Sequence, residues 1–312
     1  MLEVEKIREH GKGGSLRSFQ ADIIDQPEAL QQWEELLNAC FGVPQGRRYL
    51  EDFPVWDRQW QSGSLIRLGA FQKDQLVASV SVRLAKLRVQ DLQGSNQVVS
   101  IACVGAVATY PAFRGYGLAS ELLSLGIQWA EERSASHILL WSSGLSRLYS
   151  RLGFELLGTQ VRIPLQKIRF PQVASYEIHQ GWNPALFDVL KKRSDGLVLE
   201  SCDEAWYSAH RHVRWYWVGP EKAPLAYLAY ERGIDLKQAV HEWGGDPQGL
   251  LSLLVALKAE CPEAFLLGAS EHEAVFQDWG CEVGACEREP VAWVKSLHGS
   301  LQNFWIWGLD AT

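Results

Sequence analysis

Residues 104–119 combine a strand, a glycine-bearing loop and the start of a helix, and this segment constrains the fold more than any other. An apolar, β-branched stretch runs through a proline turn into a loop with Gly115 and Gly117, and an amphipathic helix follows directly. The glycines let backbone N–H groups converge on an anion without a Cβ in the way, and the helix adds the positive end of its dipole. The segment therefore predicts a site for a ligand that carries a pyrophosphate.

Spacing separates this loop from two familiar nucleotide-binding loops. A dinucleotide fingerprint requires G-x-G-x-x-G, and a mononucleotide P-loop requires G-x-x-x-x-G-K-[ST]. Neither fits, because Ser120 stands where the third glycine is due and no lysine follows the loop. The sequence instead matches [QR]-x-x-G-x-[GA], with Arg114, Gly117 and Ala119 at the fixed positions.

Two further elements follow the loop. Residues 136–141 form a short apolar run, which is typical of a buried parallel strand. Residues 146–154 predict a helix that carries Tyr149 and ends at Gly153, a residue suited to the left-handed position after a helix. Loop, strand and helix in this order resemble the two signatures of the Gcn5-related N-acetyltransferases (GNAT), and the resemblance is specific over residues 98–157.

The resemblance implies a mixed α/β sheet and a loop whose backbone amides hold the pyrophosphate of acetyl-coenzyme A (acetyl-CoA). The expected loop residues are Arg114, Gly115, Tyr116, Gly117, Leu118 and Ala119. Before the loop, a bulge is expected to separate the strand from its parallel neighbour, and the strand is expected to pair with the pantetheine arm through Val107, Ala108 and Thr109. The small side chains there also fit close helix packing. The side chain of Arg114 either contacts phosphate or anchors the loop through a carboxylate.

The resemblance also implies that Tyr149 is the general acid. When an amine attacks a thioester, a thiolate leaves, and a phenol within reach of the sulfur can protonate it. A phenol has a pKa of about 10 and a thiol a pKa of about 8.5, so the tyrosine stays protonated at neutral pH. The alternative is a tyrosine that only packs its helix.

The general base is left open. Glu51, Asp52, the terminal carboxylate of Thr312 and a chain of water molecules are the candidates for deprotonating an ammonium substrate. Cys103 raises the alternative of an acetyl-cysteine, although a single cysteine in a buried strand is usually an inert apolar residue. We predict no metal, because five acidic and histidine residues of the second half match no common ligand spacing: His241, Glu242, Glu271, His272 and Glu273.

Composition and charge indicate the number of domains, the kinds of partner and the location of the protein. A chain of 312 residues with 47% hydrophobic residues is long enough for about two domains. Its net charge of −7 argues against nucleic acid as a partner, and no apolar run reaches the roughly 18 to 20 residues that span a bilayer. No targeting peptide is recognisable and six cysteines are scattered, so we expect a cytoplasmic protein without a membrane partner. The 14 tryptophans indicate core packing, with an aromatic substrate pocket as the alternative.

The second half of the sequence repeats the first in outline. Strand-like segments at 224–230 and 238–243 precede a leucine-rich helix at 249–260 and a strand at 265–268. When residues 275–283 are set beside 148–156, Phe276 falls on Tyr149 and Gly280 on Gly153. Residues 244–247 offer no counterpart of the glycine-bearing loop. We therefore expect two tandem GNAT-like domains, a catalytic one at residues 1–165 and a degenerate one at 166–312 that lacks the pyrophosphate loop.

These observations predict an acetyl-CoA-dependent N-acetyltransferase. The acetyl group would pass directly to a primary amine of a small molecule or peptide within a ternary complex. The alternatives are a non-catalytic sensor that binds acetyl-CoA and an acyltransferase that uses a different acyl-CoA. Tyr149 argues against the sensor, because Phe276 illustrates how the same position looks once the acid is lost. A homo-oligomer is left open.

Overall fold

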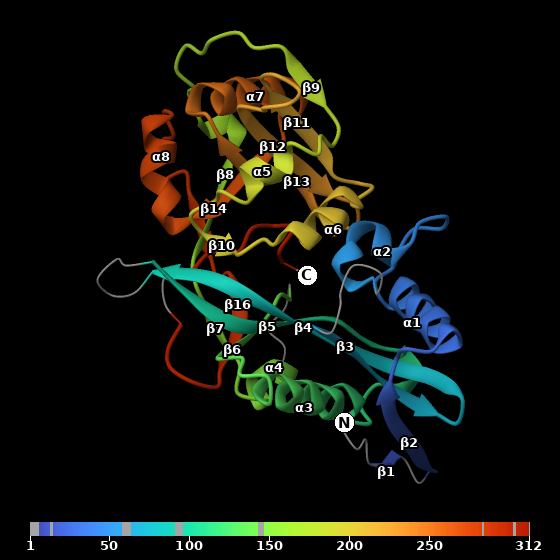
Figure 1. Ribbon diagram of the computed structural model, residues 1–312. Helices are drawn as coiled ribbons and strands as arrows, with labels where there is room; N and C mark the ends of the chain where they lie inside the picture. Colours follow the sequence, from blue (N-terminus) through green and yellow to red (C-terminus); the bar gives the residue numbers. More distant parts are fainter. Residues whose placement is uncertain are drawn as a thin grey trace.

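Two mixed β-sheets with their helices form two lobes, which Figure 1 shows one above the other. The structure is a computed structural model, and it describes residues 6–12, 15–57, 64–90, 96–142, 147–282, 284–301 and 304–311. Each sheet contains antiparallel hairpins and one parallel pair of strands. The mixed α/β class expected from the sequence is confirmed.

The first sheet has the strand order β1-β2-β3-β4-β5-β6-β16-β7, with β10 added along β4. A tight turn at Lys73 joins β3 and β4 as an antiparallel hairpin. The strands are β1 (Lys6–Lys12), β2 (Ser15–Ile23), β3 (Leu65–Gln72), β4 (Gln75–Gln90), β5 (Asn96–Thr109), β6 (His137–Leu140), β7 (Glu155–Leu157), β10 (Gly196–Leu197) and β16 (Ala292–Ser296).

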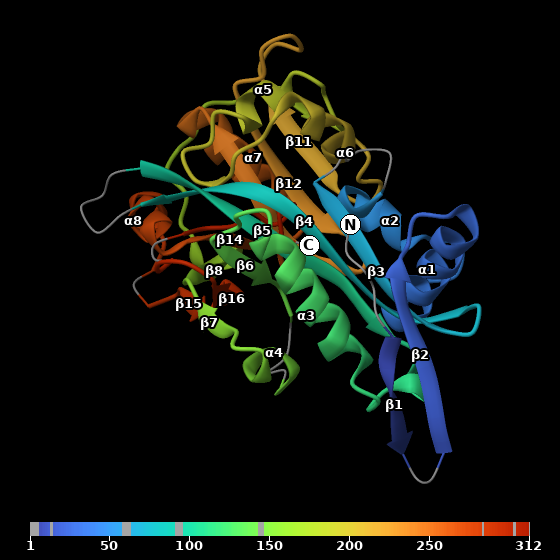
Figure 2. The same cartoon turned by 60° about the horizontal axis from the view of Figure 1, so that its bottom comes forward.

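Helices cover both faces of the first sheet. Helix α3 (Leu118–Glu131) packs on β3, β4 and β5, and Figure 2 shows it lying along one face. Helix α1 (Pro27–Cys40) begins with a proline, and the helical spacing of Trp33, Leu36 and Leu37 places these three buried residues on one face. The shorter elements are α2 (Tyr49–Asp52), α4 (Arg147–Arg151), and the 3₁₀ turns η1 (Pro54–Trp56) and η3 (Pro111–Phe113).

The second sheet has the strand order β15-β8-β14-β13-β12-β11-β9. Its strands are β8 (Gln160–Pro164), β9 (Ile178–Gln180), β11 (Arg214–Val218), β12 (Ala226–Arg232), β13 (Asp235–Gly245), β14 (Phe265–Ala269) and β15 (Glu287–Glu289). Its helices are α5 (Leu186–Leu190), α6 (Glu204–Ser208), α7 (Pro247–Glu260) and α8 (Glu273–Asp278), with 3₁₀ turns η4 (Leu165–Lys167), η5 (Ser201–Asp203) and η6 (Ser270–His272).

The two sheets repeat one topology. In the first, β3, β4 and β5 are followed by α3, β6 and α4; in the second, β11, β12 and β13 are followed by α7, β14 and α8. The parallel pairs β5–β6 and β13–β14 occupy matching places. Gly153 and Gly280 follow α4 and α8 with φ angles of +80° and +85°, as expected for glycines that end helices.

The two halves of the chain exchange a strand. Strand β8 comes from the first half but lies between β14 and β15 of the second sheet. Strand β16 comes from the end of the chain and lies between β6 and β7 of the first sheet. In Figure 1, the red β16 accordingly lies among the green strands of the lower lobe. Sequence reasoning did not foresee this exchange.

The division expected at residue 165 stays a prediction: the first sheet takes β10 and β16, and the second sheet takes β8, from the far side of that boundary. The cores are shared as well. One buried cluster joins Trp33 and Leu37 of α1 to Trp206 of α6 and Trp215 of β11. Within the described residues, no helix is long and apolar enough to cross a bilayer. The expected cytoplasmic location stays a prediction.

Candidate active site

The parallel pair β5–β6 opens after a short paired stretch. The two strands pair from Ile101 with His137 to Val104 with Leu140, where β6 ends. At Ala106, whose φ is +50°, β5 bulges and its register with β4 shifts. Residues 105–109 of β5 therefore continue beyond the last pair with β6. We call this opening the first splay, and it agrees with the separation that the resemblance implied.

The glycine-bearing loop joins the end of β5 to the start of α3. Gly115 and Gly117 have φ angles of +85° and +82°, a backbone region that L side chains rarely adopt. Gly117 is the N-cap of α3, and no side chain caps the helix there. The first N–H groups of a helix lack intrahelical acceptors, so this end of α3 can bind an anion.

Two side chains of the loop, Arg114 and Tyr116, make contacts within the protein. The guanidinium of Arg114 is exposed, and its Nε donates to the carbonyl of Thr109 at 3.2 Å. Arg114 therefore anchors the loop, although through a backbone carbonyl and not through the carboxylate considered from the sequence. Tyr116 is buried, with its ring centroid 5.6 Å from that of Phe19. The loop thus offers its backbone to a ligand.

Tyr149 lies at the first splay. A cavity of about 620 Å³ is lined on one side by residues 104–107 of β5, by residues 140–142 and by Tyr149. Burial raises the pKa of the Tyr149 phenol. Its ring lies 6.1 Å from that of Phe154 and 5.9 Å from that of Trp293 on the exchanged strand β16. The predicted acid and the predicted strand thus share one cavity, while their roles stay predictions.

The second half of the chain forms the opposite wall of this cavity. The turn between β12 and β13 contributes Arg232, Ile234 and Asp235. Residues 304–311, which we call the C-terminal tail, contribute Trp305, Ile306, Gly308 and Ala311. The cavity therefore exists only because the two halves pack together.

Carboxylates that sequence reasoning did not single out line the cavity. Asp235 pairs with Arg232 through two hydrogen bonds of 2.8 and 2.6 Å. Glu289 accepts a hydrogen bond of 2.6 Å from the amide of Gln160. No local pattern marks these residues, since their place at the cavity depends on the packing of one half on the other.

The predicted base candidates lie elsewhere or outside the described residues. Asp52 is 1% exposed, lies 2.6 Å from the imidazole of His212 and accepts the N–H of Ile234 at 2.9 Å. It thus ties α2 to the second half. Glu51 accepts the N–H of Arg48 at 3.3 Å, and neither carboxylate lines the cavity. Thr312 is outside the described residues.

Cys103 and the second-half residues considered for a metal have other surroundings. Cys103 is buried, burial raises the pKa of its thiol, and it does not line the cavity. Glu242 forms an ion pair with Arg193 at 2.8 Å, and the Nε2 of His241 lies 2.9 Å from the carbonyl of Glu231. Across the described ranges, no three His, Cys, Asp or Glu side chains are grouped as metal ligands.

The second sheet differs from the first where the loop would be. Strand β13 ends at Gly245 and α7 begins at Pro247, so no loop intervenes. Asp246 caps α7, and its carboxylate accepts the N–H of Gly249 at 2.8 Å. A negative charge therefore already occupies the helix end that remains open at Gly117 in the first sheet.

Comparison with known proteins identifies the first half. Residues 25–157 match the model of the family described as acetyltransferase (GNAT) domain. These residues belong to the GNAT family. The matched stretch of this acyltransferase family contains β5, the glycine-bearing loop, α3 and Tyr149. No curated protein matches the chain in sequence.

Solved structures extend the GNAT fold over both halves. A protein of Enterococcus faecalis described as a probable N-acyltransferase is 14% identical, with a TM-score of 0.61, over 89% of this chain and 73% of its own. A GCN5-related N-acetyltransferase from Anabaena variabilis is 15% identical, with a TM-score of 0.59, over 88% and 72%. Yeast N-myristoyltransferase, solved with myristoyl-CoA, is 12% identical, with a TM-score of 0.52, over 94% and 84%. At these identities the likeness shows the fold.

Proposed function

We propose that the protein is an acetyl-CoA-dependent N-acetyltransferase that transfers the acetyl group directly to a primary amine. One observation carries this proposal: the free edge of β5 and the phenol of Tyr149 line one cavity at the first splay, and β5 continues through the glycine-bearing loop into the open N-terminus of α3. The N-terminus of α3 offers a site for a pyrophosphate, and the edge of β5 offers a site for an amide-bearing arm. Tyr149 offers a proton where that arm would end.

The residues present fit acyl-CoA. Backbone N–H groups of residues 115–119 would hold the pyrophosphate, because both glycines keep a Cβ out of the approach. The edge of β5 at Val107, Ala108 and Thr109 would pair with the pantetheine arm as a neighbouring strand does. When bound, acyl-CoA would supply the acyl thioester.

Tyr149 would hold the proton that the departing sulfur requires. Its phenol is 8% exposed and lines the cavity, and burial raises its pKa. A raised pKa keeps the phenol protonated through the neutral range, so the acid is available whenever a thiolate forms. No described group hydrogen-bonds to this hydroxyl, which leaves its proton available.

The second half would bind no cofactor of its own. Asp246 already satisfies the N-terminus of α7 and places a carboxylate where a pyrophosphate would lie. Phe276, at the position of Tyr149, is fully buried and has no proton to donate. We propose instead that the second half shapes the acceptor side of the cavity, where Glu289 offers negative charge to an ammonium group.

Thiol release tests this function. The chain is incubated with acetyl-CoA and, in turn, spermidine, benzylamine and glycylglycine, and free CoA is followed with a thiol reagent. We expect amine-dependent release that Tyr149→Phe strongly reduces. Calorimetric binding of CoA without release from any amine in a broad panel would favour the sensor. Release with succinyl-CoA or a longer acyl-CoA, but not with acetyl-CoA, would favour a different acyl donor.

A further inference from the structure

The second sheet has a splay of its own. Strands β13 and β14 pair in parallel at Ala239 with Phe265 and at Val240 with Leu266. At His241 the register between β13 and β12 shifts, as the register between β5 and β4 shifts in the first sheet. Beyond this point β13 runs on toward α7, while β14 continues beside β8. We call this opening the second splay.

The backbone of the C-terminal tail meets β13 at the second splay. The N–H of Gly308 donates to the carbonyl of His241 at 3.1 Å. The N–H of Leu309 donates to the carboxylate of Glu242 at 3.2 Å. In the first splay the corresponding edge of β5 is the one proposed to pair with a pantetheine arm. The tail therefore offers β13 the kind of backbone hydrogen bond that an extended ligand would offer β5.

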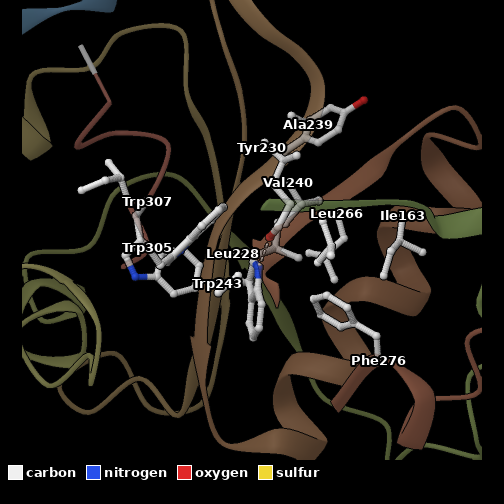
Figure 3. Packing of buried hydrophobic residues seen from close by; sticks show 14 of the residues in the cluster. Ile163, Leu228, Tyr230, Ala239, Val240, Trp243, Leu266, Phe276, Trp305 and Trp307 are labelled. Atoms are coloured by element: carbon white, nitrogen blue, oxygen red, sulfur yellow. Dashed lines mark hydrogen bonds between the residues drawn. The ribbon is translucent and has the colours of Figure 1, made fainter. Parts of the chain in front are cut away.

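Aromatic rings of the tail fill the rest of the second splay. The ring of Trp307 lies 5.3 Å from that of Trp243, and the Trp243 indole donates across the splay to the carbonyl of Leu267 at 2.8 Å. Phe276 lies 5.8 Å from the other side of the Trp243 ring system. Figure 3 shows Trp243 between the tail tryptophans and Phe276. The slot is therefore filled with packed apolar surface.

Buried charges hold the tail in place. The carboxylate of Asp310 is fully buried and pairs with Arg193 at 2.9 Å. The guanidinium of Arg232 donates to the carbonyls of Gly308 and Ala311, each at 2.8 Å. A buried charge pair is strongly destabilised when one partner is removed, so these contacts fix one position of the tail.

Gly308 is the point of closest approach. A Cβ added there would lie 2.5 Å from the Cβ of His241 and 2.7 Å from its Cγ, closer than real Cβ atoms come. A side chain at this position would therefore push the tail off β13. Gly244, which lies on β13 as His241 does, provides a matched comparison. A Cβ there would lie 3.4 Å from the Tyr227 ring, an ordinary contact.

We propose that the C-terminal tail is an intramolecular ligand of the second splay, in the place corresponding to the pantetheine arm of the first. While the tail is bound to the second splay, its residues Trp305, Ile306, Gly308 and Ala311 line the cavity. Docking of the tail thereby builds the wall that faces the amine acceptor, and the tail selects the acceptor. This last step rests on the proposed function, whereas the docking itself does not.

Hydrogen–deuterium exchange on the full chain tests the docking. In the wild type and in Gly244→Ala, we expect peptides covering residues 304–311 to be protected. In Gly308→Ala, we expect their exchange to accelerate by about 100-fold, while peptides from β5 and α3 keep their protection. Exchange of residues 304–311 at the rate of a free peptide in the wild type would overturn the proposal. Unchanged protection in Gly308→Ala would overturn it as well.

Kinetics test the role of the tail in acceptor choice. With the best amine among spermidine, benzylamine and glycylglycine, we expect Gly308→Ala to raise the amine KM at least about tenfold. The acetyl-CoA KM should stay within about twofold of that of Gly244→Ala. Equal changes in both KM values would overturn the assigned role. If none of the three amines is acetylated, the proposed function fails, and the exchange experiment still decides the docking.

A second variant covers the case in which Gly308→Ala does not fold. Asp310→Asn keeps the size of the side chain but removes the charge that pairs with Arg193. We expect faster exchange of residues 304–311 in this variant too, because the tail loses its ion pair with the buried guanidinium of Arg193, which keeps only Glu242 as a charged partner. Wild-type protection of the tail in Asp310→Asn would contradict the proposed docking.

Discussion

The ring of Trp293 lies 5.9 Å from the ring of Tyr149, although the two residues come from different halves of the chain. Trp293 belongs to the exchanged strand β16. Two residues further on, Lys295 donates to the carbonyl of Leu152 at 2.8 Å, at the end of the helix that carries Tyr149. The end of the chain therefore positions the proposed acid of the first half.

Replacing Trp293 should slow turnover without weakening cofactor binding. In Trp293→Leu the Tyr149 ring loses a neighbour, and a small displacement of an acid costs on the order of tenfold or more in kcat. The acetyl-CoA KM should change by less than about twofold, since β6 separates the strand of Trp293 from β5, which leads into the loop. Trp279→Leu, a similar change in the second half, is the control. A loss of kcat equal to that in the control would show that Trp293 acts only through stability.

Removing the Tyr149 hydroxyl should remove the acid and spare binding. We expect Tyr149→Phe to lower kcat by on the order of 10²- to 10⁴-fold, as is typical when a general acid is lost. Calorimetry should give the same affinity for CoA as in the wild type. A kcat that stays within twofold of the wild-type value would assign protonation of the sulfur to another group.

The pH profile should reflect the raised pKa of Tyr149. A general acid acts in its protonated form, so its activity is lost as pH rises through its pKa. Burial moves that loss above the ordinary phenol value of about 10. We therefore expect kcat for thiol release to show no decline from this group between about pH 7 and 9.5. A tyrosine-dependent decline near pH 8, absent from the residual activity of Tyr149→Phe, would contradict the burial argument.

Substitution of Gly117 should weaken cofactor binding and not only lower the stability of the fold. Valine at φ +82° is strained by roughly 1–3 kcal/mol, and its Cβ branches obstruct the anion site. We expect Gly117→Val to raise the acetyl-CoA KM by at least about tenfold. Gly46→Val is the matched control, because Gly46 has φ +84° in open surroundings. A similar KM in the two variants would mean that strain alone explains the effect.

Local sequence patterns predicted much of the first half. The glycine loop, Tyr149 and Gly153 occupy the places expected of them, because each depends on a few neighbouring residues. The bulge at Ala106 and the parallel pair β5–β6 agree with the arrangement that the resemblance implied. The eight tryptophans from Trp206 to Trp307 pack in the core as expected, and Trp305 also lines the cavity.

Features that depend on contacts between the halves were not predictable in this way. The exchange of β8 and β16 could not be predicted from the periodicity of apolar residues, because a strand has the same alternation whichever sheet it joins. Asp235 and Glu289 reach the cavity only through that packing. Asp52 illustrates the opposite case, since its carboxylate was a candidate base from the sequence and is instead buried beside His212.

Acid should destabilise the protein through His241. Burial lowers the pKa of His241 to about 4, so the folded state binds fewer protons than the unfolded state between about pH 6.5 and 4. Stability is therefore present above pH 6.5 and is lost as pH falls, by about 2 kcal/mol at pH 5. Urea denaturation at pH 8 and pH 5 isolates this contribution when the wild type is compared with His241→Gln, because the shifted pKa values of His210 and Glu242 act in both proteins. His241→Gln should show a correspondingly smaller loss, whereas the exposed His298→Gln should match the wild type.

Calorimetric titration of the full chain with CoA tests the central claim most directly. The account predicts one site per chain, lost or severely weakened in Gly117→Val. Asp246→Ala should bind CoA as the wild type does, while losing about 0.5–2 kcal/mol of stability with the α7 cap. Absence of binding to the wild type, a second site per chain, or loss of binding in Asp246→Ala but not in Gly117→Val would contradict it.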